Sequence, residues 1–584
     1  MTLSKERFSQ WLHHPTLNQE IKEELIAIQN NETEIEERFY THLSFGTGGM
    51  RGELGAGTNR MNIYTIRKAT FGLSQYVHNQ ENKNPDKQKS VVIAYDCRHK
   101  SPEFAEEAAL TLAEQGIRAY VYPTLRSTPQ LSFSVRRLQA DAGIMITASH
   151  NPPEYNGYKA YGPDGAQLNL ADADAVIQYV NQVENELNVP VMDKQEALDK
   201  GLLVYVQEEL DRDYIDYVSS LVLEPGVIRD MAESYKIVFT PFHGTGLMPV
   251  QKVLEQVGFK NVNIIEAQAV PDPNFSTVKS PNPEEHEAFN LAIQYAKEHG
   301  ADIIMGTDPD ADRMGIVVAN PEGEYVVLTG NQTGALLLNY ILSRKAEKGL
   351  LDPALDTICK TIVTSEMGRV VGEAYGIKTI DTLTGFKFIG EKIKGFKENG
   401  NGRYVFGYEE SYGYLIGDDV RDKDAIQAVM IAAEMGAYYK SKGMTLLDAL
   451  EELYQQHGYF KEDMISITLK GKEGVAKIAQ AIDHLRENPV LQFGQHQVTV
   501  MEDYEKQERI IYSSAGQVEK KEKIDLPQSN VLKYILDNGA WFCVRPSGTE
   551  PKLKIYIGVR EKSATEALAQ VAEMKEEMNR LIPV

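Results

Sequence analysis

The sequence has little cysteine. Its 584 residues include only Cys97, Cys359 and Cys543, an odd number spread far along the chain. A disulfide framework or a cysteine-rich zinc site needs several cysteines at suitable spacings, so this usage argues against both. It is typical of a protein kept in a reducing compartment, and we expect a cytoplasmic location.

Positive charge and long apolar runs are also scarce. Lysine and arginine total 61 against 84 aspartates and glutamates, which gives a formal net charge of -23. This balance argues against nucleic acid or an anionic membrane surface as the main partner. Residues 1–7 lack the apolar core of a signal peptide, and no uninterrupted apolar stretch reaches membrane length. An anionic small-molecule substrate would therefore need a local basic pocket. The sequence carries no signal for an oligomeric state.

Strand-like and helix-like patterns alternate through most of the chain, and the alternation recurs three times. Strands are predicted at 91–95, 119–122, 142–146, 236–240, 262–265, 302–305, 358–363, 378–380 and 404–406. Helices are predicted at 102–114, 284–298 and 366–375, after Gly246, and from Gly385. Such alternation implies α/β units with parallel sheets and crossover helices.

The pattern changes from about Tyr459. Residues 464–469 and 552–559 alternate with period two, and a helix is predicted between them at 474–486. A chain of 584 residues corresponds to about four domains. We therefore predict three consecutive α/β domains with mixed or parallel sheets and a C-terminal α+β domain, arranged around one central cleft. The predicted ranges are 1–205, 206–325, 326–452 and 453–584.

An acidic loop follows the apolar run Ile303–Met305. It contains Asp308, Asp310 and Asp312, with Arg313 directly after them. Three like charges so close repel one another, and oxygen ligands at this spacing suit Mg²⁺ or a similar ion. An EF-hand loop is excluded, because its sixth and twelfth positions would be Arg313 and Ala319 in place of glycine and glutamate. A metal site is favoured over the remaining alternative, a solvated acidic turn.

Ser149 and His150 follow another apolar run, residues 142–146. Ser149 could be a nucleophile at the end of a buried strand, or a capping residue at a turn limited by proline. Lys159 adds an amine that could serve as a base or as a phosphate partner. Ser149, the acidic loop and Glu409 each come after the last predicted strand of their unit, where α/β sheets present ligand sites. We expect these segments to converge on one cleft.

A candidate phosphate loop lies near the C-terminus, at residues 545–551. Residues 547–550 fit a capping box, which would normally open a helix. Residues 553–559 alternate with period two, so a strand follows and the box has no helix to cap. The turn formed by Ser547, Gly548 and Thr549, flanked by Arg545 and Lys554, therefore suits a phosphate dianion better than a plain turn.

Together these motifs resemble the α-D-phosphohexomutase superfamily, and most closely its phosphoglucomutase branch in the longer form that includes phosphopentomutase-like members. Residues 407–413, Gly-Tyr-Glu-Glu-Ser-Tyr-Gly, are similar to the family's sugar-recognition loop, and residues 545–551 to its phosphate-binding loop. Residues 48–52 are similar to its N-terminal glycine–arginine turn. The serine loop around Ser149, the acidic loop, the sugar-recognition loop and the phosphate-binding loop occur in the family's order. These four motifs together are far more specific than any one of them.

The resemblance implies phosphoryl transfer through Ser149. Mg²⁺ would be held by the three aspartates and by one oxygen of the Ser149 phosphate. Lys159 is the first choice for the base and His150 the second, and Arg51 would lie near the reacting phosphate. The implied substrate contacts are Arg313, Thr384, Gly385, Lys387, Glu409, Ser411, Lys423, Arg545, Ser547, Gly548, Thr549 and Lys554.

Two residues depart from the family's pattern. Lys554 stands where the family usually has arginine, which keeps the charge but loses the bidentate fork. Leu383 replaces a proline that is common before the Thr384 element. The turn His243–Gly246 opens a predicted helix, and we leave it out of the implied site as a tight turn.

The implied reaction interconverts glucose 1-phosphate and glucose 6-phosphate, with glucose 1,6-bisphosphate as intermediate and activator. Phosphomannomutase and phosphopentomutase activities stay open, because a loop that reads the 3- and 4-hydroxyls sees the same groups in glucose and mannose. A sugar phosphatase is disfavoured, since hydrolysis needs no second phosphate site. A non-catalytic sensor is disfavoured because it need not keep Ser149 together with three metal aspartates.

Overall fold

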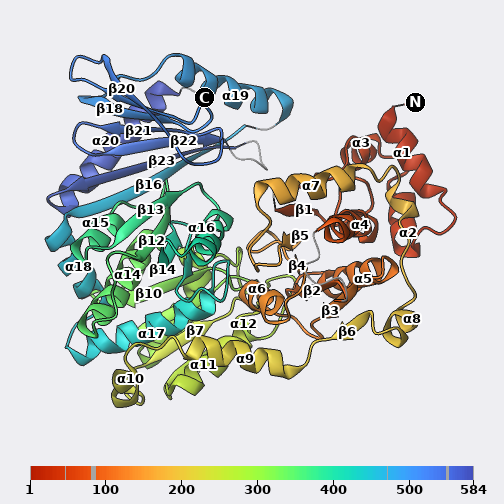
Figure 1. Ribbon diagram of the computed structural model, residues 1–584, viewed down its shortest axis with the longest axis horizontal. Coiled ribbons are helices and arrows are strands. Elements are labelled where there is room, and N and C mark those ends of the chain that lie inside the picture. Colours follow the sequence, from red (N-terminus) through yellow and green to blue (C-terminus); the bar gives the residue numbers. More distant parts are fainter. Residues whose placement is uncertain (1, 47, 81–86, 470, 547–551, 583–584) are drawn as a thin grey trace.

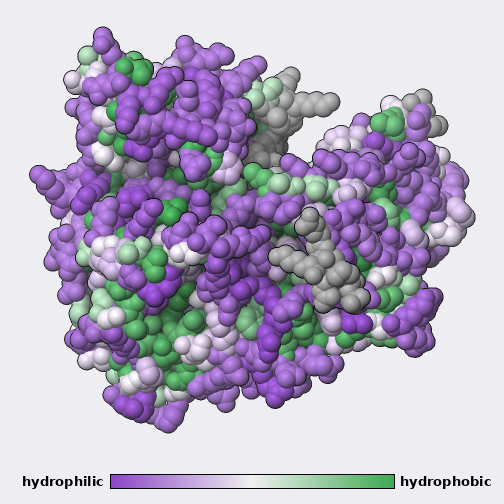
Figure 2. Space-filling view, in the orientation of Figure 1, coloured by the Kyte–Doolittle hydropathy of each residue, from purple (hydrophilic) through white to green (hydrophobic). Residues whose placement is uncertain are grey.

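The computed structural model describes residues 2–46, 48–80, 87–469, 471–546 and 552–582 (Figure 1). Three α/β units follow one another along the chain, and a largely antiparallel α+β unit ends it, as the sequence predicts. In Figure 1 the first unit lies at the right, the second and third at the lower left, and the C-terminal unit at the upper left. The face shown in Figure 2 is mostly hydrophilic. Within the described ranges, no helix is long and apolar enough to cross a membrane.

The first unit combines a mixed sheet with three helices that precede it. Its strand order is β1-β5-β4-β2-β3-β6. Strands β4, β2, β3 and β6 run parallel to one another, β5 is antiparallel to β4, and β1 is antiparallel to β5. The elements are α1 (Leu3–Leu12), α2 (Gln19–Ile28), α3 (Glu32–Phe39), β1 (Gly49–Glu53), α4 (Ile63–Asn79), β2 (Ser90–Tyr95), α5 (Ser101–Glu114), β3 (Arg118–Val121), α6 (Thr128–Arg137), β4 (Ala142–Ile146), β5 (Tyr155–Tyr161), α7 (Leu170–Asn181), η1 (Glu186–Asn188), α8 (Lys194–Asp199) and β6 (Leu203–Tyr205).

The second and third units repeat this plan with smaller sheets. Their strand orders are β11-β10-β9-β7-β8 and β13-β12-β14-β15, and the pairs β9–β10, β10–β11 and β14–β15 are antiparallel. The second unit contains α9 (Glu208–Ser219), α10 (Pro225–Met231), β7 (Ile237–Thr240), α11 (Leu247–Val257), β8 (Val262–Ile264), α12 (Glu266–Ala269), η2 (His286–Phe289), α13 (Asn290–His299), β9 (Ile303–Thr307), β10 (Met314–Ala319) and β11 (Tyr325–Val327). The third contains α14 (Gly330–Glu347), β12 (Asp356–Thr361), α15 (Met367–Ala374), β13 (Lys378–Thr382), α16 (Phe386–Asn399), β14 (Arg403–Glu409), β15 (Gly413–Leu415), α17 (Ala425–Ser441) and α18 (Leu446–His457).

The C-terminal unit is an antiparallel sheet in the order β16-β23-β22-β21-β18-β19-β20, with β17 paired to β18. Its elements are β16 (Tyr459–Thr468), α19 (Gly471–Glu487), β17 (Gln492–Phe493), β18 (His496–Asp503), β19 (Glu508–Tyr512), β20 (Val518–Lys523), β21 (Leu532–Leu536), β22 (Trp541–Pro546), β23 (Lys552–Glu561) and α20 (Ala564–Leu581). The antiparallel sheet explains the period-two pattern at residues 464–469 and 552–559, because neighbouring side chains face opposite sides.

Inner strands such as β2 and β4 are largely apolar because both faces of their sheet are covered. Along β2, Val92 and Ala94 join a buried cluster with residues of α6, whereas Val91 and Ile93 join another with residues of α5. Burial on both sides produces the continuous apolar runs of parallel strands. The first of these clusters continues through the second and third units to Phe460, so one apolar core connects the three α/β units.

The structure corrects several sequence predictions. The helix predicted at 284–298 begins only at Asn290, after η2, because Glu284 is paired with Arg313 in a loop. Glu409 is the last residue of β14 rather than a residue beyond it. The antiparallel strands β5, β10 and β15 were not predicted, nor were α1–α3. Two predicted boundaries, 325/326 and 452/453, fall inside β11 and α18, so they are better drawn after Val327 and at Gly458.

Candidate active site

Three of the predicted motifs occupy equivalent positions in the fold. Each is the turn of a hairpin in which an inner strand is followed by an antiparallel strand: β4 to β5, β9 to β10, and β14 to β15. Each turn holds one residue other than glycine in the left-handed region, namely Ser149 (φ 49°), Ala311 (φ 52°) and Tyr412 (φ 65°). Such conformations carry local strain and persist where the surroundings fix them.

The hairpin turns contact one another and the helix ends beside them, at the start of α17 and of α6. The Met314 amide donates to the Tyr412 carbonyl at 3.1 Å, and the Ala425 amide donates to the Ala311 carbonyl at 3.2 Å. The Thr128 amide, from the first unit, donates to the Asp310 carbonyl at 2.9 Å. The motifs therefore converge, as the sequence predicts from their positions at strand ends.

The acidic loop is a site fitted for a cation. Carboxylate oxygens of Asp308, Asp310 and Asp312 all lie within 4.8 Å of one another, and all three side chains are buried. One oxygen of each carboxylate is buried without a hydrogen-bond partner among the described residues. Three buried, partly unsatisfied carboxylates match the oxygen ligands that Mg²⁺ prefers. The residues present therefore fit the expected metal.

The charges of the acidic loop act strongly on one another. Burial, together with the neighbouring carboxylates of Asp310 and Asp312, raises the pKa of Asp308 well above its usual range. Burial also opposes ionisation of Asp310, but the Lys159 ammonium outweighs it and holds the pKa of Asp310 well below its ordinary value. Without a cation, the loop is therefore stabilised unevenly, with one aspartate compensated and another repelled.

Ser149 lies against this loop. Its Oγ donates to Oδ2 of Asp310 at 3.1 Å and accepts from Nζ of Lys159 at 3.0 Å. Lys159, on β5, also lies 2.8 Å from Asp310 and 3.5 Å from Asp312. Burial disfavours its charge, yet these two aspartates outweigh burial and raise the pKa of Lys159. Hydroxyl, ammonium and carboxylates thus form one contact network across two units.

Arg98 holds the serine turn in place, and the sequence interpretation missed it. Its guanidinium donates to the carbonyls of Ser149 at 2.6 Å, Pro152 at 2.7 Å and Tyr155 at 3.0 Å, and also to that of Asn151. Arg98 is almost completely buried. The available signal was a charged pair, Asp96 and Arg98, directly after the apolar strand 91–95, at the same sheet edge as Ser149.

Asp96 also stabilises the serine turn, through Thr147. It accepts from the Thr147 hydroxyl at 2.6 Å, and Thr147 in turn accepts from the Ser149 amide at 2.8 Å. Buried hydrogen bonds therefore fix both backbone groups of Ser149. Arg98 binds its carbonyl, and Asp96 acts on its amide through Thr147.

His150 and Arg51 lie beside the serine turn. Nδ1 of His150 is buried without a partner in the part of the chain that the structure describes. Burial, followed by the nearby charges of Arg313 and Arg51, lowers the pKa of His150 well below its ordinary value. Arg51, on β1, donates to Oδ1 of Asn151 at 2.7 Å.

The sugar-recognition motif is connected to the acidic loop through Lys423. Nζ of Lys423 lies 3.1 Å from Asp312 and 3.0 Å from Asp422, and the side chain is largely buried, so it is not a solvated surface lysine. Glu409 accepts from the Gly385 amide at 2.9 Å. Burial raises the pKa of Glu409 to about 7 despite the opposing charge of Lys423.

A cleft of about 520 Å³ joins the four units. Of the predicted site residues, it is lined by His150, Arg313, Thr384, Gly385, Glu409, Ser411, Lys423, Arg545 and Lys554. Its lining residues do not include Ser149, Lys159, the three aspartates of the acidic loop, Arg51 or Lys387. They do include His150 and Arg313, which directly follow Ser149 and Asp312 in the sequence. Lys387 lies on α16 with its ammonium 5.3 Å from the centre of the Phe388 ring. Ser547, Gly548 and Thr549 lie outside the described residues.

The C-terminal unit supplies the basic end of the cleft. Arg545 on β22 and Lys554 on β23 are direct cross-strand partners. Burial and the adjacent Arg545 guanidinium lower the pKa of Lys554. A bound anion would offset the repulsion between these two neighbouring positive charges. This arrangement is expected of a phosphate site.

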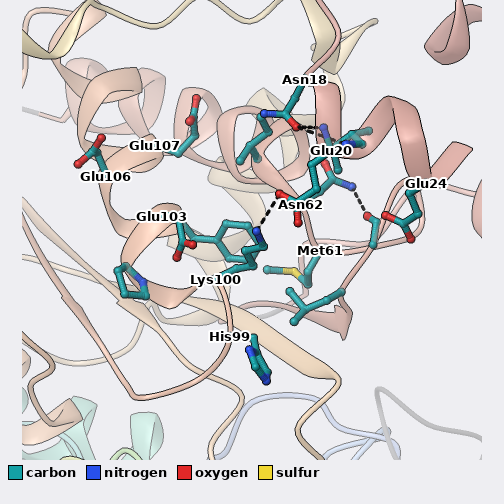
Figure 3. Close-up of a pocket in the computed structure, with 16 residues that line it drawn as sticks. Asn18, Glu20, Glu24, Met61, Asn62, His99, Lys100, Glu103, Glu106 and Glu107 are labelled. Carbon is teal, nitrogen blue, oxygen red and sulfur yellow. Dashed lines mark hydrogen bonds and ion pairs between the residues drawn. The ribbon is translucent and has the colours of Figure 1, made fainter. Parts of the chain in front are cut away.

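A second hollow, of about 680 Å³, lies where α2, α4 and α5 meet (Figure 3). Glutamates gather around it, including Glu20, Glu103, Glu106 and Glu107, and Lys100 is paired with Glu20 at 2.9 Å. None of the predicted site residues lines it, and its excess of carboxylates would repel an anionic substrate. The four-unit cleft is therefore the candidate active site.

Comparisons with known proteins agree with this geometry. Models of the phosphoglucomutase/phosphomannomutase family match in order: α/β/α domain I at residues 42–187, domain II at 212–323, domain III at 329–457, and the C-terminal domain at 494–574. A phosphoglucomutase of Staphylococcus haemolyticus (strain JCSC1435) is 40% identical over 525 residues, covering 90% of this chain and 91% of that protein. A phosphoglucomutase of Staphylococcus aureus (strain MRSA252) is 39% identical over 537 residues, covering 91% and 92%.

Solved structures share the fold. Paramecium pp63/parafusin, a phosphoglucomutase in its open form, matches with a TM-score of 0.69 at 18% identity, covering 93% of this chain and 96% of that one. A putative phosphomannomutase of Thermus thermophilus matches with a TM-score of 0.67 at 20% identity, covering 92% and 99%. The helices α1–α3 precede the first matched domain.

The acidic loop generates a prediction about metal binding that needs no substrate. Mg²⁺ should raise the melting temperature of the wild-type protein. At a free Mg²⁺ concentration of a hundred times the dissociation constant, binding should add about 2.7 kcal/mol to the free energy of unfolding. Asp308→Asn should lose this shift, while its metal-free melting temperature should be unchanged or higher because one repelling charge is gone. Differential scanning calorimetry measures both quantities. Asp230→Asn, an exposed aspartate in an ion pair, is the control. A full Mg²⁺ shift in Asp308→Asn would contradict the metal site.

Proposed function

The chain belongs to the phosphoglucomutase/phosphomannomutase family, and from that premise we propose that it is a hexose-phosphate mutase that interconverts glucose 1-phosphate and glucose 6-phosphate. The observation that carries the proposal is the placement of Ser149. Its hydroxyl contacts both Lys159 and the acidic loop, and the next residue, His150, lines a cleft that Arg545 and Lys554 also line. A mutase needs this combination, because one phosphate must react while another is only bound.

In this proposal the resting enzyme carries a phosphoryl group on Oγ of Ser149. Asp308, Asp310 and Asp312 would hold Mg²⁺, together with one oxygen of that phosphate, and the ion would supply positive charge to the transferring group. Arg98 and Asp96 keep the turn in its left-handed conformation, so that Oγ faces the acidic loop throughout the cycle. Arg51 and Arg313 add positive charge near the reacting group.

Transfer then moves the phosphoryl group from Ser149 to the free hydroxyl of the sugar phosphate. The bond between phosphorus and the serine oxygen breaks, a bond to the sugar oxygen forms, and the product is glucose 1,6-bisphosphate. The proton of the sugar hydroxyl must leave. Lys159, the first choice from the sequence, contacts Oγ, but Asp310 and Asp312 outweigh burial, raise its pKa and hold it as an ammonium, which suits charge stabilisation rather than proton uptake. His150, the second choice from the sequence, lines the cleft with an unsatisfied ring nitrogen and a pKa lowered by burial, so we propose it as the base.

The bisphosphate must turn around before the second transfer. Arg545 and Lys554, with the loop at 547–549, would hold the phosphate that is not reacting in either orientation. Glu409 and Ser411 would bind the sugar hydroxyls, and Lys423 connects this loop to Asp312. The second transfer returns a phosphoryl group to Ser149 and releases the isomerised sugar phosphate.

A direct assay tests the reaction and its alternatives. Glucose 1-phosphate, supplied with Mg²⁺ and a trace of glucose 1,6-bisphosphate, should be converted to glucose 6-phosphate. Release of free phosphate instead would indicate a phosphatase, and binding without turnover a sensor. Comparison of kcat/KM for the 1-phosphates of glucose, mannose, glucosamine and ribose should favour glucose. A site that leaves a buried polar group unpaired discriminates by powers of ten, so a preference for ribose would identify a phosphopentomutase.

Ser149→Ala should lower mutase turnover by orders of magnitude, because the phosphoryl group has no substitute acceptor in covalent transfer. Turnover is measured with glucose 1,6-bisphosphate present, so that the enzyme is fully primed. Ser234→Ala, an exposed serine in the second unit, should leave turnover unchanged. Near-normal turnover of Ser149→Ala would overturn the phosphoserine mechanism.

Arg545→Ala should weaken the handling of sugar phosphates. A hydrogen bond to a charged group contributes about 1.5 to 3 kcal/mol, so kcat/KM should fall by about 10- to 150-fold. The melting temperature should stay close to that of the wild type, since Arg545 lines the cleft. Arg580→Ala, on the exposed side of α20, is the matched control. An unchanged kcat/KM for Arg545→Ala would remove this loop from the site.

A further inference from the structure

The turn His243–Gly246, between β7 and α11, packs closely against the acidic loop. A Cβ on Gly244 would lie 2.4 Å from Cα of Pro309, and one on Gly246 would lie 2.4 Å from Oγ1 of Thr307. Neither position has room for any side chain. The turn therefore packs its backbone directly against the segment that carries the three aspartates.

Thr245 bonds this turn to the loop. Its backbone amide and its hydroxyl both donate to the Pro309 carbonyl, each at 2.9 Å. The Thr245 side chain is buried. Gly246, not Thr245, stands at the N-cap of α11, so the Thr245 hydroxyl is not used to cap that helix.

Thr128, from the first unit, also makes two hydrogen bonds to the acidic loop. Its amide donates to the Asp310 carbonyl and its hydroxyl to Oδ2 of Asp310, each at 2.9 Å. Thr128 is the first residue of α6, where Ser127 already supplies the capping side chain. Arg126, just before this helix, is held by three hydrogen bonds to Asp211, the shortest of 2.6 Å.

Two threonines from different units thus bond to the successive carbonyls of Pro309 and Asp310, in the middle of the acidic loop. We propose that Thr128 and Thr245 act together as a clamp that fixes the acidic loop in its metal-binding conformation. The mutual repulsion of the three carboxylates favours spreading of the loop when no cation is bound. Four donor groups oppose this spreading, three on the two adjacent carbonyls and one on the Asp310 carboxylate.

The clamp residues are positioning residues, because they would act on the cation through the loop. Groups that orient metal ligands typically change metal affinity by about 10- to 100-fold when they are removed. The proposal rests on the proposed function only in that the acidic loop binds a divalent cation. Metal affinity, rather than turnover, is therefore its measure.

The experiment titrates purified protein with Mn²⁺ and follows free Mn²⁺ by electron paramagnetic resonance. Thr128→Val and Thr245→Val remove a hydroxyl with little change of shape, and each should raise the Mn²⁺ dissociation constant by about 10- to 100-fold. Thr128→Ser and Thr245→Ser keep the donor and should bind close to wild type. Thr111→Val is the matched control, because Thr111 is a completely buried threonine whose hydroxyl donates within α5, to Glu107.

Several outcomes would overturn the clamp. Unchanged Mn²⁺ affinity in both valine variants would do so, as would an equal loss in Thr111→Val, which would show a general effect of destabilisation. Absence of Mn²⁺ binding in the wild type would also overturn it. If a valine variant does not fold, the alanine variant at the same position replaces it. Failure of the mutase assay with intact Mn²⁺ binding would refute the proposed function and leave the clamp to be judged by these affinities.

Discussion

The three buried carboxylates of the acidic loop are the constraint on which the site depends. Asp308, Asp310 and Asp312 cannot remain so close in a buried environment unless positive charge is brought to them. The chain brings it from two other units: Lys159 from the first and Lys423 from the third. The same charges that prepare the cation site therefore also join the three α/β units, so the arrangement of the units and the geometry of the site share one set of interactions.

The strain in the three hairpin turns follows from this arrangement. Ser149, Ala311 and Tyr412 adopt left-handed backbone conformations that residues with a side chain rarely take. Such turns persist only when the surroundings over-determine them. Arg98 supplies that support at Ser149 by binding four carbonyl groups, and the hairpins support one another where Met314 bonds to Tyr412. The proposed nucleophile, Ser149, is thus held in one conformation by buried backbone contacts.

Sequence reasoning found what local pattern can show. Strands buried on both faces are continuous apolar runs, so 142–146 was predicted with its observed bounds, and the acidic loop was recognisable from its spacing. Local pattern could not identify contacts between residues that lie far apart in the sequence. Arg98 and Thr245 bind carbonyl groups, which every residue carries, so no residue type marks their partners. The helix predicted at 284–298 began late for the same reason, because Glu284 is held by Arg313 from another part of the chain.

The basic end of the cleft must be held at a fixed distance from Ser149 if one sugar bisphosphate is to fit in both orientations. Contact between the third and C-terminal units holds the basic end of the cleft in place. An apolar cluster that includes Val363 and Trp541 joins them, and buried Lys533 donates to the Ile362 carbonyl at 2.7 Å. Lys533 also lies 4.6 Å from the centre of the Trp541 ring. Lys533 lies on β21 and Trp541 on the adjacent strand β22, which also carries Arg545, so these contacts fix the position of Arg545 relative to the third unit.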